Sequence, residues 1–103
     1  MDLNPADVRA LYMLAGMCLQ AGERERGLEL TAHSVAMQPE DYGVLYNAAC
    51  FYSNAGELER ALQVLDRAVA TGRGYRRWME NDSDLDRFRG DPRFKEIMAR
   101  LPP

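Results

Sequence analysis

The sequence predicts an all-α fold in which antiparallel helix pairs stack as an α-solenoid and a C-terminal helical segment closes the stack. The main observation is that the chain matches itself after a shift of 34 residues. Leu11-Tyr12 recurs as Leu45-Tyr46, and Ala21-Gly22-Glu23 recurs as Ala55-Gly56-Glu57. A fixed period of this length is typical of repeated two-helix units, each of which buries its apolar face against a neighbour.

The first unit is expected over residues 6–38. Asp7 is placed to cap its first helix, whose apolar side chains follow the i, i+3, i+4, i+7 spacing of one helix face. Gly22 can adopt the positive φ that ends this helix and turns the chain. A second helix is predicted over residues 23–37, before Pro39. The inward positions of the two helices are Leu11, Leu14, Ala15, Cys18, Leu28, Thr31, Ser34 and Val35.

The second unit, residues 39–72, repeats this arrangement. Asp41 is predicted to cap its first helix, and Gly56 is predicted to turn the chain into the second. The inward positions of the two helices are Leu45, Ala48, Ala49, Tyr52, Ala61, Leu62, Leu65, Ala68 and Val69. The alanines among them should let the paired helices approach closely.

The period breaks in residues 73–103, which we expect to form a capping segment of short helices. A short helix is predicted over residues 75–81 and a helical turn over residues 83–88. Asp91 is placed to cap a last helix with Pro92 at its first position, where a missing N–H costs nothing. The side chains expected to pack on the second unit are Trp78, Leu85, Phe88, Phe94 and Ile97.

Composition excludes several classes of function. The net charge of −3 comes from interleaved acids and bases, and no basic stripe suits a nucleic-acid backbone. No apolar run reaches the length that a membrane span needs. Cys18 and Cys50 both fall in helical patterns, which is more typical of buried thiols than of a disulfide. We therefore expect a cytoplasmic protein with no nucleic-acid or membrane partner.

The second unit resembles the tetratricopeptide repeat family at Leu45, Ala48, Ala49, Tyr52, Gly56, Ala61, Leu65 and Ala68. The first unit departs from the family pattern at Cys18, Gly27, Thr31 and Ser34, and we expect these departures to weaken its packing. Residues 78–94 resemble the segment that closes many bacterial arrays of this family. Pro5 stands where Pro39 does, so residues 1–5 read as the tail of a preceding repeat in a longer array.

The resemblance implies a concave groove, lined by the first helix of each unit, in which a peptide or a helix binds. Tyr12 and Tyr46 would offer flat amphipathic contacts, although they could equally serve to hold neighbouring helices apart, and Asn47 could bind a peptide backbone. Family members that grip a chaperone's C-terminal carboxylate carry lysine and asparagine where this chain has Tyr12 and Gly16, so that ligand is not expected. The implied lining is Arg9, Tyr12, Met13, Gly16, Gln20, Gly43, Tyr46, Asn47, Cys50 and Asn54.

Metal and catalytic sites are not expected. Asp82, Asp84 and Asp86 alternate as the first ligands of a calcium loop do, but Arg87 and Arg93 stand where that loop needs glycine and glutamate. We interpret these acids as helix caps and solvated charge. His33, the only histidine, has no cysteine at ligand spacing, and no nucleophile or phosphate-loop motif is present. The sequence thus predicts neither an enzyme nor a bound cofactor.

The function expected from the sequence is protein–protein interaction within a larger regulatory or enzyme-linked protein, through a peptide or helix bound in the groove. The alternative is a structural segment that forms a homo-oligomer. In that case the exposed N-terminal face of the first unit would pair with another copy of the chain.

Overall fold

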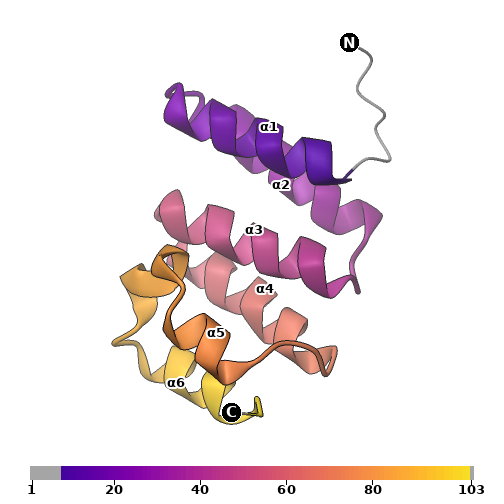
Figure 1. Ribbon diagram of the computed structural model, residues 1–103. Helices are drawn as coiled ribbons and strands as arrows, with labels where there is room; N and C mark the ends of the chain where they lie inside the picture. The colour runs from indigo at the N-terminus through magenta and orange to yellow at the C-terminus, as the bar shows by residue number, and fades with distance from the viewer. Residues whose placement is uncertain (1–7, 103) are drawn as a thin grey trace.

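The computed structural model describes residues 8–102, and the chain is all-α over this range, with no β-strand (Figure 1). Two long helix pairs are followed by three short helices. The elements are α1 Val8–Gln20, α2 Arg24–Met37, α3 Tyr42–Asn54, α4 Leu58–Ala70, α5 Arg76–Glu80, the 3₁₀ helix η1 Ser83–Phe88, and α6 Pro92–Ala99. The predicted all-α class is therefore confirmed.

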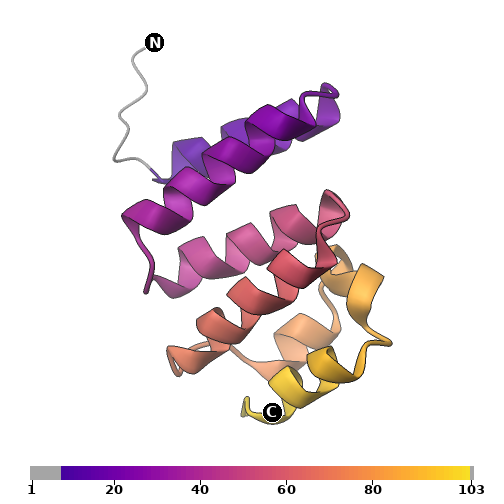
Figure 2. The same ribbon diagram turned by 180° about the vertical axis from the view of Figure 1, so that it is seen from behind.

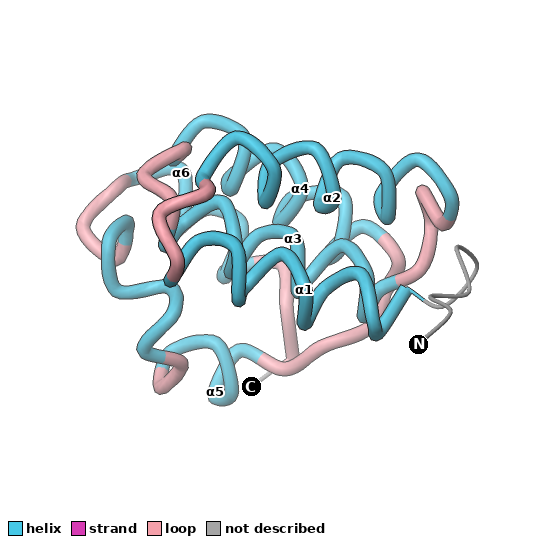
Figure 3. Tube along the Cα trace, turned by 90° about the horizontal axis from the view of Figure 1, so that it is seen from above, coloured by secondary structure: helices cyan, strands magenta, loops and turns pink. Residues whose placement is uncertain are grey.

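The helices lie in two layers. α1 packs antiparallel to α2, and α3 packs antiparallel to α4, so that α1 and α3 form one layer (Figure 1) and α2 and α4 form the other (Figure 2). The view from above shows α5 on the α1–α3 side of the molecule (Figure 3), whereas α6 packs against α4. The C-terminal segment thus covers part of both layers. None of the helices in the described range is long and apolar enough to cross a membrane.

The two turns inside the helix pairs have the same geometry. Gly22 and Gly56 have φ angles of 83° and 81°, the left-handed region that glycine enters without steric cost. The N–H of the next residue then closes each turn: Glu23 N donates to Cys18 O at 2.7 Å and Glu57 N donates to Tyr52 O at 2.8 Å. The prediction of a positive φ at the first turn is confirmed.

The predicted caps of the later helices are also present. The Asp41 carboxylate accepts a hydrogen bond from Val44 N at 3.0 Å, and the Asp91 carboxylate accepts one from Arg93 N at 2.8 Å, directly before Pro92. Each bond satisfies a backbone N–H that the first helical turn leaves unpaired. The predicted cap at Asp7, like the interpretation of Pro5, lies outside the described residues.

The core is centred on α3, which is buried along most of its length between α4, the first helix pair and η1. All nine inward positions predicted for the second unit are buried. In the first unit the prediction is confirmed except at Leu14 and Val35, which are only half-buried. Residues at the edge of a stack have neighbours on one side only, so their burial is less complete.

Gly27 corrects one expectation from the sequence. It is buried where α2 meets α1 and α3, and a Cβ atom on it would lie 2.7 Å from Phe51 Cζ and 3.0 Å from the carbonyl oxygen of Ala15. Such distances are well inside van der Waals contact. The absence of a side chain at this position therefore allows close packing of Phe51 rather than weakening the first helix pair.

The C-terminal segment packs as predicted at four of five positions. Leu85, Phe88, Phe94 and Ile97 are buried, and the rings of Phe88 and Phe94 meet edge to face with centroids 5.1 Å apart. The prediction for Trp78 is wrong, because its side chain is 66% exposed. Its neighbour in the chain, Met79, fills the core position instead and is fully buried.

The orientation of α5 explains why Met79 is buried and Trp78 is exposed. Arg76, at the first position of α5, donates through its guanidinium to Met98 O at 3.2 Å and to Leu101 O at 2.7 Å, while its backbone N–H donates to Pro102 O at 3.0 Å. These bonds fix one side of the helix against the C-terminal end of the chain. Met79, three residues further on, lies on that same side, and Trp78 is left facing solvent.

Candidate binding face

One face of the molecule, formed by α1, α3, α5 and the start of η1, carries its exposed aromatic side chains and three hollows. We call the largest the Trp78 hollow; it has a volume of about 970 Å³ and is lined by Tyr75, Arg77, Trp78, Asn81, Asp82, Ser83 and Asp84. The adjoining Tyr42 hollow, of about 770 Å³, shares Tyr75 and Trp78 with it and adds Tyr42, Tyr46, Asn47, Gly72, Arg73, Gly74 and Pro102. The third, of about 180 Å³, lies between the two helix pairs and is called the inter-pair cleft.

Trp78 and Tyr75 stand between the two larger hollows, and each is 66% exposed. Large aromatic side chains are costly to leave in water, so a neighbouring pair of them is informative. Tyr42 lies deeper, stacked on Tyr46 with ring centroids 5.7 Å apart. The aromatic surface therefore continues from α5 onto α3.

Two carboxylates stand beside these aromatic residues. Asp82 caps η1 by accepting a hydrogen bond from Asp84 N at 3.0 Å, and it also accepts one from the phenol of Tyr46. Asp84 accepts a hydrogen bond from the side-chain amide of Asn54 at 3.1 Å. Neither carboxylate forms an ion pair with any residue in the described range. Their negative charge is held by neutral donors alone.

The phenol and thiol groups near Asp82 and Asp84 have raised pKa values. Burial raises the pKa of Tyr46 well above its ordinary value, and the hydrogen bond to Asp82 raises it further. Burial also raises the pKa of the Cys50 thiol, again with contributions from Asp82 and Asp84. Burial likewise raises the pKa of Tyr12, on α1, and the charges of Asp84 and Asp82 raise it further. Burial, with a further contribution from the two carboxylates, therefore keeps these hydroxyl and thiol groups protonated.

The ligand atoms of Cys50, Asp82 and Asp84 lie within 4.8 Å of one another, a spacing that a metal ion could bridge. The raised pKa of the thiol opposes the thiolate that a metal would need. Asp86 does not join the other two aspartates, because it pairs with Arg89 at 2.6 Å. The arrangement is thus a hydrogen-bonded cluster at the start of η1 and differs from the alternating ligands of a calcium loop.

The inter-pair cleft brings together four of the groove residues expected from the sequence: Arg9, Tyr12, Gly43 and Asn47. Its floor includes Thr31, a buried residue whose hydroxyl has no hydrogen-bond partner among the described residues. Ser34 is also present, and its hydroxyl donates to Thr31 O at 2.8 Å. The cleft offers polar groups from both helix pairs within a small space.

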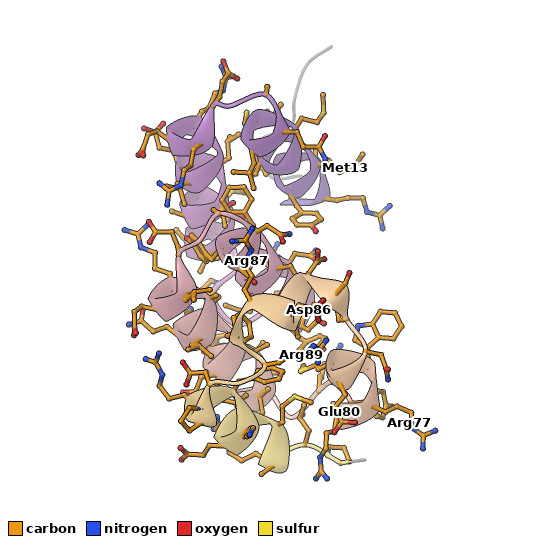
Figure 4. The ribbon with its side chains drawn as sticks, turned by 90° about the vertical axis from the view of Figure 1, so that its left-hand side faces the viewer. Met13, Arg77, Glu80, Asp86, Arg87 and Arg89 are labelled. Carbon is orange, nitrogen blue, oxygen red and sulfur yellow. The ribbon has the colours of Figure 1, made fainter. Side chains whose placement is uncertain are left out.

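The other expected groove residues are placed differently. Met13 is exposed on α1 (Figure 4), and Gln20 and Asn54 are exposed at the ends of their helices, whereas Gly16 is half-buried. Tyr46 still lines the Tyr42 hollow, whereas Cys50 lines none of the three hollows, and both side chains are buried. The reason is that η1 folds over this part of α3.

The sequence reasoning missed Tyr42, Tyr75, Trp78, Asp82 and Asp84 as residues of this face. The signal available for them was weak. Trp78 and Met79 are adjacent apolar residues in a five-residue helix, and only one of them can face the core. Asp82 caps η1 as expected, whereas Asp84 lies in the first turn of η1 and is not a cap. The contacts of both residues with α3 depend on how the C-terminal segment docks.

Comparison of the chain with protein-family models, with curated proteins and with solved structures gave no match. The protein is therefore described by its own fold and by the surface that carries the three hollows. It is an all-α protein of antiparallel helix pairs, with an aromatic surface on the side of α1, α3 and α5 that carries the carboxylates of Asp82 and Asp84 at one end.

Proposed function

We propose that this protein is a tetratricopeptide-type interaction module that binds an extended peptide or a helix of a partner protein across the face formed by α1, α3 and α5. The observation that carries the proposal is the exposed pair Tyr75 and Trp78 between two adjoining hollows of about 970 and 770 Å³. Aromatic residues bind partners well because they present a large rigid surface and lose little conformational entropy.

Two features support the repeat class. The helix pairs share the same turn at Gly22 and Gly56, as their sequences do. Two ion pairs, Glu59 with Arg93 and Asp66 with Arg100, join α4 to α6 at a separation of 34 residues. α6 thus lies beside α4 at the position where the second helix of a third repeat would lie. In this comparison α5 and η1 take the place of the first helix of that repeat.

Tyr12 and Asn47 supply further contacts in this proposal. Both line the inter-pair cleft, and the side-chain amide of Asn47 can donate and accept hydrogen bonds along an extended backbone. Tyr46 lines the Tyr42 hollow, and its phenol also donates a hydrogen bond to Asp82. The partner would therefore meet α1 at Tyr12 and α5 at Trp78, with Asn47 between them.

We infer a binding role rather than a catalytic one, in a cytoplasmic protein that forms part of a larger regulatory or enzyme-linked chain. His33 is exposed on α2, on the opposite layer, and among the described residues no base stands beside an activated nucleophile. Cys18 and Cys50 are both buried and free, as in proteins of a reducing compartment.

The test is selection of binders from an unbiased displayed peptide library, using the full chain, followed by mapping of bound peptides with ¹⁵N chemical shifts. We expect the shifts to cluster on α1, α3 and α5. Tyr12→Ala should weaken binding about tenfold, as loss of a central aromatic contact does, while His33→Ala on the opposite layer should leave it unchanged. A library without binders, or binders that perturb only α2 and α4, would refute the proposal.

The alternative of self-association has one supporting observation. Met13 and Met17 lie one turn apart on α1 and are 61% and 64% exposed. A second copy of the chain could cover them. Light scattering over a range of concentrations tests this alternative. It would be favoured if the molecular mass doubled with increasing concentration and if Met17→Glu returned the mass to the monomer value.

A further inference from the structure

We propose that the Trp78 hollow binds a basic side chain of the partner peptide, a lysine or an arginine, between the indole of Trp78 and the carboxylates of Asp82 and Asp84. The inference rests on the proposed function, since it names the chemistry of a peptide that the face would bind. It goes further by predicting which residue of that peptide is selected.

The first step is that the hollow has an excess of negative charge. Asp82 and Asp84 both line it, and within residues 8–102 neither is paired with a cation. The phenol of Tyr46 and the amide of Asn54 each supply one neutral hydrogen bond, which leaves further acceptor capacity on the carboxylate oxygens. A cation entering the hollow would be the first to pair with these groups.

The second step is that the nearby arginines do not fill this role. Arg89 is fully engaged elsewhere: it pairs with Asp86 at 2.6 Å and donates to Asp82 O at 2.5 Å and to Met79 O at 3.3 Å. Arg77 lines the hollow but extends outward from α5, away from the body of the molecule (Figure 4). The charge of the two carboxylates is therefore available to a partner.

The third step is the position of Trp78 on the same hollow. A tryptophan ring is the best aromatic partner for a cation, and a guanidinium can stack on the ring while donating to a carboxylate at its edge. Tyr75, equally exposed, adds a second aromatic surface.

Other occupants fit less well. An apolar side chain would remove water from Asp82 and Asp84 without pairing them, which is costly. An acidic side chain would meet two like charges. Charge complementarity therefore selects the basic residue.

The experiment uses three blocked tripeptides, in which alanine flanks a central arginine, norleucine or glutamate. Each is titrated into the ¹⁵N-labelled full chain, and the indole N–H of Trp78 and the amide of Asp84 are followed. Trp78 is the only tryptophan, so its fluorescence gives a second, independent signal. We expect the arginine peptide to shift both resonances saturably and to bind about tenfold more tightly than the other two.

Two matched variants test the carboxylates. Asp84→Asn keeps an oxygen that can accept from Asn54 but removes the charge, and it should weaken the arginine peptide about tenfold. Glu80→Gln, on α5 but outside the hollow and without an ion pair in the described range, removes a neighbouring negative charge and should leave binding unchanged. Trp78→Leu, at an exposed position that does not threaten folding, should also weaken the arginine peptide about fivefold.

The outcomes separate this inference from the proposed function. If the norleucine or glutamate peptide binds as tightly as the arginine peptide, or if no tripeptide binds, the basic-residue inference is wrong. Library peptides that bind α1, α3 and α5 but lack a required basic residue would overturn it as well, while leaving the peptide-binding function intact. A library with no binders on this face would overturn both.

Discussion

The phenol of Tyr46, near the middle of α3, donates a hydrogen bond to the carboxylate of Asp82, the residue that caps η1. This bond joins a buried position of the second helix pair to the start of the C-terminal segment. It also fixes Asp82 beside Asp84, with Cys50 beneath them. The shape and the charge of the Trp78 hollow therefore depend on Tyr46, which does not itself line that hollow.

Tyr46→Phe should destabilise the protein by about 1–2 kcal/mol, because it removes a hydrogen bond to a charged group and leaves the ring packing in place. The measurement is the free energy of unfolding by chemical denaturation, followed by circular dichroism. Tyr75→Phe is the matched control, since Tyr75 is exposed and makes no side-chain hydrogen bond in the described range. Equal stability of both variants and the wild type would show that the Tyr46–Asp82 bond contributes nothing.

The free energy of unfolding should fall as the pH rises above about 9. Burial is the main reason why the pKa values of Cys50 and Tyr46 lie above their ordinary values of 9.0 and 10.0. The unfolded chain therefore releases these protons first, so the folded state binds more protons and loses stability as the pH increases. Below the ordinary values both states are protonated and stability is constant with respect to these groups.

Denaturation curves at about pH 8 and about pH 10.5 test this dependence. The wild type should lose stability between the two values, and Tyr46→Phe should lose less, because only Cys50 of the two groups then remains. A variant that loses as much as the wild type would mean that Tyr46 does not titrate with a raised pKa.

Much of the fold could be predicted because its signals are local and repeated. The 34-residue period, the glycines at the two turns and the capping aspartates act within a few residues of where they stand. The inward positions of the second unit were predicted correctly for the same reason, since each follows the spacing of its own helix.

The candidate site was predicted poorly, because it depends on how the C-terminal segment docks. Nothing in the local pattern around Tyr46 shows that η1 covers it, or that Asp82 comes within hydrogen-bonding distance from 36 residues away. Likewise, the choice between Trp78 and Met79 for the core is made by the contacts of Arg76 with the end of the chain. The resemblance to tetratricopeptide repeats suggested alanine as the better residue at position 27, whereas the contact with Phe51 favours glycine.

Gly27→Ala should therefore destabilise the protein by about 1–3 kcal/mol, although alanine is the better helix former, because the added methyl group overpacks the contact with Phe51. Gly16→Ala is the control. Gly16 is also inside a helix, but a Cβ atom there has no neighbour within 4 Å, so this variant should be stabilised by up to about 1 kcal/mol. Thermal unfolding of both variants decides the point; an increase in Tm for Gly27→Ala would mean that Phe51 moves aside at little cost.

Phe94→Ala should destabilise the protein by about 3 kcal/mol or more, since Phe94 is buried between α6 and the core and its ring contacts Phe88. Trp78→Ala removes a larger side chain but should change stability by less than about 0.5 kcal/mol, because Trp78 packs little against the protein. Circular dichroism is the suitable measurement, as the second variant has no tryptophan fluorescence. Together the two results would establish that the C-terminal segment is held by its phenylalanines, while its tryptophan is left free for a partner. A large loss of stability in Trp78→Ala would instead make Trp78 a structural residue and remove the main support for the binding face.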